Sequence, residues 1–163
     1  NLHSKNGTKI DNITNAINLL IKSKIEIRKI SNLYETPSYP NQKLPKFLNI
    51  GLLADFKSNE IELLDKIRSI EKKLGRNKAK KNDPRIIDID IIDFKNIVKK
   101  TNDLILPHPR CHLRNFVLFP ILQIDPNWFH PILKKNAQYL INNLSQKSRI
   151  EITRLQKNVN IEI

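Results

Sequence analysis

Apolar residues recur along this chain with two different spacings, and these spacings predict its secondary structure. Between Lys9 and Lys24 they lie three or four positions apart, which predicts an amphipathic helix capped near Asp11. A second helix is predicted to begin at Asn59 and to end at Gly75. Its buried stripe is predicted to consist of Ile61, Leu64, Ile67, Ile70 and Leu74.

The stretches between these helices are rich in aliphatic and aromatic residues and predict strands. The predicted strands are residues 25–36, 47–56 and 86–94. A further helix is predicted for residues 112–119, closed by Pro120. The order helix, strand, strand, helix, strand becomes β-α-β-β-α-β if one more strand precedes it. We therefore predict an α+β fold, a ferredoxin-like antiparallel sheet with helices packed on it, whose first strand is apparently missing from the given chain.

Composition narrows the class of protein. The 163 residues are enough for one domain, so residues 1–163 are predicted to form a single domain. No apolar run approaches the ~20 residues that a membrane helix requires, so no membrane partner is expected. Cys111 is the only cysteine, which favours a reducing, cytoplasmic location. The chain contains no methionine, and we expect residues ahead of Asn1.

Two aspartates in the third predicted strand are the strongest chemical signal. Asp88 and Asp90 lie two positions apart, so in a strand they share one face with Cα atoms about 6.5–7 Å apart. Their carboxylates can converge on one or two hard cations. Many basic residues lie nearby in the sequence, namely Lys72, Lys73, Arg76, Lys78, Lys80, Lys81, Arg85 and Lys95. Carboxylates for a metal beside cations for oxyanions indicate that the chain handles a polyphosphate.

Each of these features also has a simpler explanation. The net charge of +13 attracts nucleic acid, anionic membranes or phosphorylated small molecules without distinguishing them. The aspartates could be solvent-facing charges on an edge strand, and His108 could simply cap a turn. A zinc site is not expected at His108, because no cysteine or third histidine is expected nearby. With three glycines in all, the chain has neither a P-loop nor a G-x-G-x-x-G turn.

The order of several segments resembles a known family. These segments are Tyr34-Glu35-Thr36-Pro37, Phe47-Leu48-Asn49, Leu74-Gly75-Arg76, Pro84 to Ile91, Leu106 to Arg110, and Arg114 to Leu122. They look like the consecutive signatures of 6-hydroxymethyl-7,8-dihydropterin pyrophosphokinase. That folate-pathway enzyme moves pyrophosphate from ATP to the pterin hydroxymethyl group and releases AMP. The resemblance runs nearly end to end and implies a cytoplasmic transferase.

The resemblance implies roles for individual residues. Asp88 and Asp90 would hold two Mg²⁺ ions between the ATP phosphates and the pterin hydroxyl, and Arg76 and Arg85 would stabilise the transferred group. Further contacts with the nucleotide would come from Glu71, Lys78, His108 and Arg114. The pterin pocket would be lined by Thr36, Pro37, Phe47, Asn49 and Phe116. In that pocket Phe47 and Phe116 would sandwich the ring, and Asn49 would match its hydrogen-bonding edge.

Two departures from the family pattern concern residues 76–84, a basic loop predicted to close over the substrates. The family often has a tryptophan ahead of Pro84-Arg85, where this chain has Lys81-Asn82-Asp83, and Lys78 stands where an arginine is common. A catalytically inactive relative is therefore one alternative. A small basic nucleic-acid-binding domain is the other. As a pyrophosphokinase the chain would have ATP and the pterin as partners, no nucleic acid, and possibly a neighbouring folate-pathway enzyme.

Overall fold

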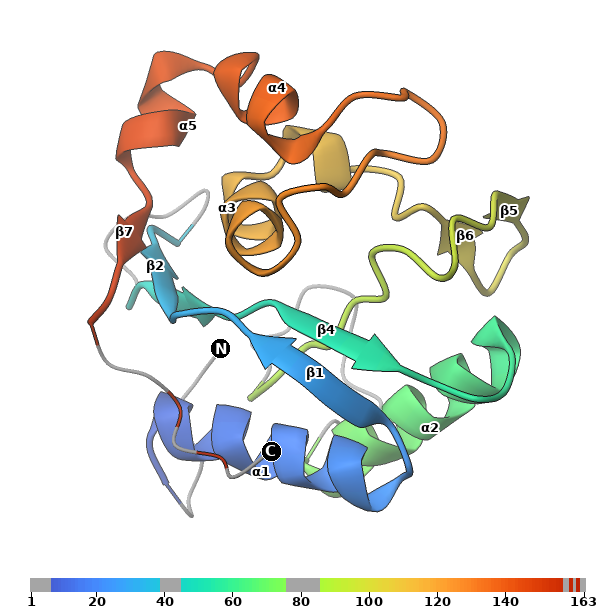
Figure 1. Cartoon of the computed structure of the whole chain (residues 1–163). Helices are drawn as coiled ribbons and strands as arrows, with labels where there is room; N and C mark the ends of the chain where they lie inside the picture. The colour runs from blue at the N-terminus through green and yellow to red at the C-terminus, as the bar shows by residue number, and fades with distance from the viewer. Residues whose placement is uncertain (1–6, 39–44, 76–85, 157–158, 160, 162–163) are drawn as a thin grey trace. The chain divides into compact units, whose positions relative to one another are not determined.

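The computed structural model describes residues 7–38, 45–75, 86–156, 159 and 161 (Figure 1). The chain divides into two compact units. Unit 1 comprises Asn1–Arg28, Ala54–Asp90 and Val159–Ile163, and unit 2 comprises Lys29–Leu53 and Ile91–Asn158. The divisions fall inside strands β1 (Glu26–Ile30) and β4 (Leu52–Asp55), which pair with each other. Helices and antiparallel sheets both occur, so the predicted α+β class is confirmed.

Helix α1 (Lys9–Lys22) begins where the apolar pattern predicted, and its N-cap lies three positions before Asp11. Thr8 is the N-cap, and its side chain accepts a hydrogen bond from Asp11 N at 3.2 Å. Asp11 Oδ2 in turn accepts from Thr8 N at 2.7 Å, and hydrogen bonds from Thr8 lower the pKa of Asp11. The two residues form a capping box, in which the acidic residue stands at the third helical position. The prediction placed the cap at the wrong member of this pair.

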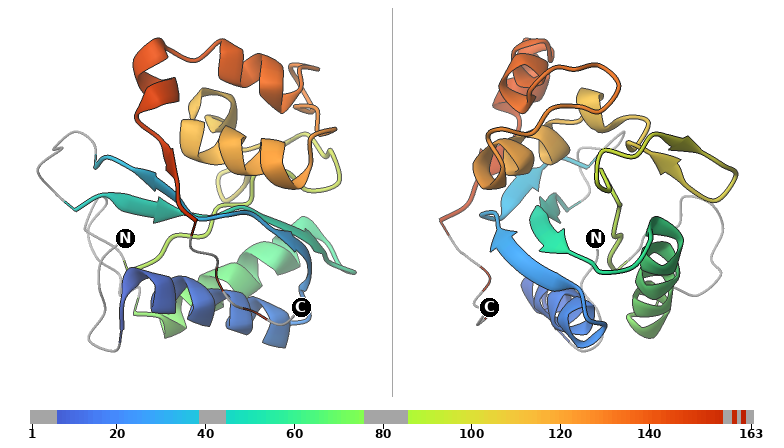
Figure 2. Two further views of the ribbon diagram at one scale, coloured as in Figure 1. Left: turned by 60° about the vertical axis from the view of Figure 1, so that its left-hand side comes forward. Right: turned by 45° about the vertical axis from the view of Figure 1, so that its right-hand side comes forward.

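Helix α2 (Glu60–Lys73) has the predicted ends. Asn59 caps it by accepting from two backbone N–H groups, and Gly75 follows it with a φ of 97°, a left-handed conformation that favours glycine. Helices α1 and α2 lie side by side (Figures 1 and 2). Their facing apolar residues form the buried centre of unit 1: Ile13, Ala16, Ile17, Leu20, Ile67 and Ile70. Ile61, predicted in the stripe, is 40% exposed, because it lies in the first turn.

In unit 2, strand β2 (Tyr34–Thr36) is the middle of a three-stranded sheet with β3 (Phe47–Asn49) and β7 (Thr153–Arg154). The predicted strands 25–36 and 47–56 are thus each divided in two. The division occurs where Ser31 faces Gly51: Ser31 N donates to Gly51 O at 2.9 Å, and Ser31 Oγ accepts from Gly51 N at 2.8 Å. A side chain takes one of the ladder's hydrogen bonds at this point, so the regular pairing is interrupted.

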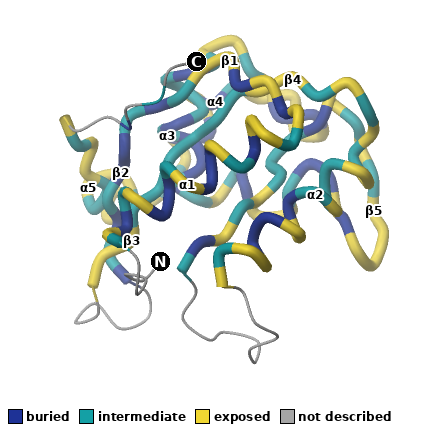
Figure 3. The backbone as a smooth tube through the Cα atoms, turned by 90° about the horizontal axis from the view of Figure 1, so that it is seen from below, coloured by how far each residue is buried: buried dark blue, intermediate teal, exposed yellow. Residues whose placement is uncertain are grey.

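Beyond its three-stranded sheet, unit 2 contains a short two-stranded sheet and several short helices (Figure 1), and Figure 3 shows how far each segment is buried. These elements are β5 (Lys99–Lys100), β6 (Ile105–Leu106), the 3₁₀ helix η1 (Cys111–Leu113), α3 (Asn115–Ile124), α4 (Ala137–Asn142) and α5 (Gln146–Ile150). Leu118, Leu140 and Ile141 form a buried cluster between α3 and α4. Among the described residues, no helix is long and apolar enough to cross a membrane.

The prediction that Pro120 closes the third helix was wrong, because α3 continues to Ile124. Pro120 lies inside α3 and is buried. A Cβ atom added to Gly51 would lie 2.6 Å from Pro120 Cβ, so the chain beyond β3 passes very close to α3. This close packing offsets the hydrogen bond that proline removes from the helix.

The predicted strand 86–94 was also wrong, because no strand is assigned to these residues. The first residues of this segment nevertheless alternate between buried and exposed side chains, as the prediction required. Ile87 is buried and Ile89 is half-buried, whereas Asp88 and Asp90 are both exposed. The two carboxylates therefore emerge on the solvent side of the segment, as a period of two requires.

Candidate functional site

The segment that carries Asp88 and Asp90 is fixed to unit 1 by a buried carboxylate. Glu71, on the last turns of α2, is only 2% exposed, and its Oε1 accepts a hydrogen bond from Ile89 N at 2.9 Å. Ile89 is the residue between the two aspartates, so this hydrogen bond anchors the backbone from which both carboxylates project. The structure thus gives Glu71 a positioning contact, which the sequence did not indicate. Whether Glu71 also contacts a nucleotide stays a prediction.

Strands β2 and β3 bring three of the predicted pterin-binding residues together in unit 2. In their antiparallel register Tyr34 is opposite Asn49, and Thr36 is opposite Phe47. Asn49 Nδ2 donates to Thr36 Oγ1 at 3.0 Å and to the backbone oxygen of Tyr34 at 3.4 Å. Because both contacts use the amide nitrogen, the Oδ1 atom is the end of Asn49 that can accept a hydrogen bond from a ligand.

The exposure of these residues suits an aromatic ligand. Thr36 is 6% exposed and Pro37 is half-buried, whereas the Phe47 ring is 39% exposed. Phe116, the other predicted ring of the pocket, lies in the first turn of α3, and the Arg114 guanidinium stands 5.4 Å from its ring centroid. A large apolar ring that stays exposed beside polar groups is typical of a surface that receives a flat heterocycle.

His108 and Arg114 also lie together in unit 2. His108 Nδ1 accepts a hydrogen bond from Arg110 N at 3.2 Å, so the neutral imidazole carries its proton on Nε2. Arg114 Nη1 lies 3.5 Å from that Nε2 atom. Two donors directed at one region are matched by an anion that accepts from both. The turn-capping role of His108 is therefore confirmed, and it is compatible with an anion-binding role.

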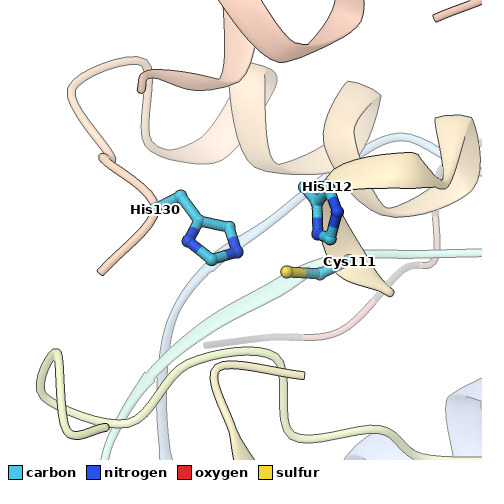
Figure 4. Close-up of side chains that lie close together, drawn as sticks. All are labelled: Cys111, His112 and His130. Atoms are coloured by element: carbon cyan, nitrogen blue, oxygen red, sulfur yellow. The ribbon is translucent and has the colours of Figure 1, made fainter. Parts of the chain in front are cut away.

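One cluster was missed by the sequence analysis. Cys111, His112 and His130 point toward one another, with one ligand atom of each within 4.8 Å of the others (Figure 4). The premise that no cysteine or third histidine would gather was therefore wrong, because His130 comes from a segment distant in the sequence. Among the described residues, His112 Nδ1 is buried without a hydrogen-bond partner.

The protonation of this cluster argues against a metal ion. His130 Nδ1 accepts hydrogen bonds from Ile132 N at 3.2 Å and Leu133 N at 3.1 Å, which leaves the proton on Nε2. A protonated ring nitrogen has no lone pair for a metal. With no metal bound, burial lowers the pKa of His130 and raises the pKa of Cys111 to about 11. A bound metal would displace the thiol proton, so it is the hydrogen bonds accepted by His130 Nδ1 that disfavour a metal here. We assign the cluster to packing.

Arg76, Lys78 and Arg85 lie outside the described residues, as does the loop of residues 76–84. Their predicted roles, and the prediction that this loop closes over the substrates, stay predictions.

Comparisons with known proteins agree with the predicted family. A model of the family described as 7,8-dihydro-6-hydroxymethylpterin-pyrophosphokinase (HPPK) matches residues 1–126. The chain is 41% identical over 134 residues to "2-amino-4-hydroxy-6-hydroxymethyldihydropteridine pyrophosphokinase" of Aquifex aeolicus (strain VF5), a match that covers 82% of this chain and 83% of that protein.

Two larger relatives match over a smaller share of their length. The chain is 35% identical over 144 residues to "Folic acid synthesis protein FOL1" of Dictyostelium discoideum, which covers 88% of this chain and 22% of that protein. It is 38% identical over 127 residues to "Bifunctional protein FolKE" of Lactococcus lactis subsp. cremoris (strain MG1363), which covers 76% of this chain and 36% of that protein. The chain thus spans most of the Aquifex protein but only about a fifth to a third of these two.

Proposed function

This chain belongs to the 7,8-dihydro-6-hydroxymethylpterin-pyrophosphokinase family, and we propose that the residues described above carry out its reaction. The sequence left open a pyrophosphokinase, a catalytically inactive relative and a nucleic-acid-binding domain, and the family match favours the pyrophosphokinase over the nucleic-acid-binding domain. The family, the activity and its place in folate biosynthesis, which the sequence predicted, are thereby confirmed. In this reaction the pterin hydroxyl oxygen forms a bond to the β-phosphorus of ATP, the bond between that phosphorus and the α-phosphate oxygen breaks, and AMP leaves.

Asp88 and Asp90 are proposed to hold magnesium. Both carboxylates are exposed on the same side of their segment, and carboxylate oxygens are the ligands that Mg²⁺ prefers. When bound, Mg²⁺ neutralises phosphate charge that would otherwise repel the attacking hydroxyl. Glu71 supports the assignment, because its hydrogen bond to Ile89 N orients the backbone between the two ligands. A count of two ions is part of the proposal.

His108 and Arg114 are proposed to bind the nucleotide phosphates. His108 Nε2–H and the Arg114 guanidinium are both hydrogen-bond donors, and their nitrogen atoms lie 3.5 Å apart. An anionic oxygen that accepts a hydrogen bond from each would suit this pair. Arg114 also stands over the Phe116 ring. Arg114 would therefore connect the predicted nucleotide-binding and pterin-binding residues of unit 2.

The pterin is proposed to bind at Thr36, Pro37, Phe47, Asn49 and Phe116. The observation that carries this proposal is the orientation of Asn49, whose amide nitrogen is engaged by Thr36 and Tyr34. Its Oδ1 atom is then presented as an acceptor, and the pyrimidine edge of a pterin carries N–H donors that match it. The exposed Phe47 ring supplies an apolar face for stacking.

The extent of the domain, its location, its topology and its partner are also proposals. We propose that residues 1–163 act as one pyrophosphokinase domain in the cytoplasm, with a ferredoxin-like arrangement of strands and helices. Several relatives are named as bifunctional or as folic acid synthesis proteins and are much longer than this chain, which supports a neighbouring folate-pathway enzyme as a partner.

A coupled assay tests the function directly. AMP released from ATP is measured with and without 6-hydroxymethyl-7,8-dihydropterin, in the presence and absence of Mg²⁺. Rapid AMP release is expected only when the pterin and Mg²⁺ are both present. Release of ADP, or AMP release that ignores the pterin, would contradict the proposal. Binding that falls steeply with salt on addition of DNA or RNA, with no AMP formed, would instead support the nucleic-acid-binding alternative.

A further inference from the structure

Gln123 lies at the centre of a polar network that the proposed reaction does not yet explain. Its Oε1 atom accepts two hydrogen bonds, from Asn32 N at 3.0 Å and from the Tyr34 hydroxyl at 2.9 Å. Its Nε2 atom donates to Asn32 Oδ1. Asn32 Oδ1 also accepts from Arg154 Nη2 at 2.6 Å, and Asn32 Nδ2 donates to Leu155 O at 3.4 Å. The Gln123 side chain on α3 therefore contacts the backbone of Asn32 and the side chains of Asn32 and Tyr34, where β2 begins.

The network fixes the relation between one helix and one strand. Gln123 is near the end of α3, and the residues that it binds lead into and begin β2. The Tyr34 ring, which is 5% exposed, lies 6.4 Å from the Phe119 ring of the same helix. A second point of contact is the close approach of Gly51 to Pro120. Polar contacts hold one end of this helix against β2, and tight apolar packing holds its middle against the chain between β3 and β4.

The residues proposed to bind the pterin are divided between these same elements. Thr36 is two positions after Tyr34 on β2, so the two side chains share a face of the strand. Asn49 is opposite Tyr34 on β3 and donates to its backbone oxygen. Phe116 is seven positions before Gln123 on α3, which is close to two turns, so both residues lie on one side of the helix. The distance between the two walls of the pocket thus depends on how α3 is held against β2.

We propose that Gln123 is a positioning residue for the pterin, which sets Thr36 and Asn49 on the sheet relative to Phe116 on the helix. This inference rests on the proposed function, because it requires the pterin to bind these residues. A glutamine suits the role, since one carbonyl oxygen has lone pairs for both donors and the amide nitrogen satisfies Asn32. Without that oxygen, a backbone N–H and a hydroxyl at the start of β2 would lose their common acceptor, and the strand could shift against the helix.

The test compares three variants. Gln123→Met keeps the length of the side chain and removes both its acceptor and its donor. Gln123→Glu keeps the acceptor for Asn32 N and for the Tyr34 hydroxyl. Gln138→Met is the matched control, because Gln138 is exposed on α4 and its amide donates to Asn142, one turn along the same helix. Dissociation constants for the pterin, with a nonhydrolysable ATP analogue and Mg²⁺ at saturation, and for the ATP analogue alone are measured by titration calorimetry.

Gln123→Met is expected to weaken pterin binding about tenfold, as the loss of three hydrogen bonds at a positioning residue implies, and to leave binding of the ATP analogue within about twofold. In turnover, the KM for the pterin should rise by more than kcat falls. Gln123→Glu keeps the shared acceptor but loses the donor to Asn32 Oδ1, so it should lose less pterin affinity than Gln123→Met, and Gln138→Met should be unchanged. This pattern separates positioning from a general loss of structure, which would affect both ligands alike.

Several outcomes would overturn the inference. Unchanged pterin binding in Gln123→Met would do so, as would an equal weakening of both ligands, or a loss of pterin affinity in Gln123→Glu as large as that in Gln123→Met. If Gln123→Met does not fold, Tyr34→Phe removes only one of the two donors, and an unchanged pterin affinity in that variant would overturn the inference as well. If the unmodified chain itself binds no pterin, the proposed function fails and this inference fails with it. Pterin binding that is intact in every variant contradicts only the role of Gln123.

Discussion

Two regions of this molecule hold their functional side chains by different means. On β2 and β3, Thr36, Phe47 and Asn49 are set by an antiparallel ladder and by hydrogen bonds between side chains. Asp88 and Asp90 stand on a segment to which no strand is assigned, and there a buried carboxylate, Glu71 Oε1, accepts the hydrogen bond from Ile89 N. A ladder thus distributes the positioning over many backbone groups, whereas on the aspartate segment the backbone N–H between the two carboxylates is held by a single side chain.

The largest effect is expected from the aspartates. Asp88→Ala and Asp90→Ala should each lower kcat by about 10³-fold or more, equivalent to ~4 kcal/mol, because the phosphate charge is no longer neutralised by a bound metal. Both carboxylates are exposed, so Tm should stay within about 2 °C. AMP release and thermal unfolding measure the two quantities. Asp65→Ala, which removes an exposed carboxylate from α2, is the control. Near-normal turnover, or a large fall in Tm, would contradict the metal-ligand assignment.

Asn49→Leu should have the next largest effect, and only on one substrate. Pterin binding should weaken about tenfold to a hundredfold, since leaving a ligand's hydrogen-bonding edge unpaired costs ~1–3 kcal/mol. The affinity for the ATP analogue should not change. Titration calorimetry with each ligand separates the two effects, and Asn102→Leu in an exposed turn is the control. If both affinities fall together, the assignment of Asn49 to the pterin is wrong.

Substitutions at Glu71 test how far the position of Asp88 and Asp90 depends on this one carboxylate. Glu71→Gln keeps an oxygen that can accept from Ile89 N, and it should retain most of the turnover. Glu71→Met removes that acceptor and should cost ~1–3 kcal/mol in the free energy of unfolding, with about tenfold lower kcat. Thermal unfolding and AMP release are the measurements. A raised KM for ATP in Glu71→Gln, at unchanged stability, would instead show that the carboxylate contacts the nucleotide, as the sequence predicted.

The smallest effect concerns pH. Burial lowers the pKa of His130 in the folded chain below its usual value near 6.5. The unfolded chain therefore binds a proton that the folded chain does not, so the contribution of His130 to stability is complete above pH ~6.5 and is lost as the pH falls through that range. His130→Asn keeps an acceptor for the Ile132 and Leu133 N–H groups and should lose less Tm between pH 7.5 and 5.0. An equal loss of Tm in both proteins would contradict this assignment.

The corrections to the predicted fold share a physical cause. The helix that was predicted to stop at Pro120 continues to Ile124, because Pro120 packs closely against Gly51. The strand that was predicted to continue through Ser31 is interrupted there, because its hydroxyl takes the hydrogen bond of Gly51 N. In both cases a contact with a residue far along the chain decided a boundary that local propensity had placed elsewhere.

The two long helices, an antiparallel sheet, the common face of Asp88 and Asp90, and the family could all be predicted from the sequence. These depend on local periodicity, on capping residues and on motifs that are continuous in the chain. Tertiary packing, by contrast, created three contacts that no sequence pattern predicted: Glu71 with Ile89, Gln123 with Asn32 and Tyr34, and His130 with His112. Each of these contacts spans between 18 and 91 positions of the sequence, and the partner of a buried polar group is chosen by which chain segments pack together, which no local pattern records.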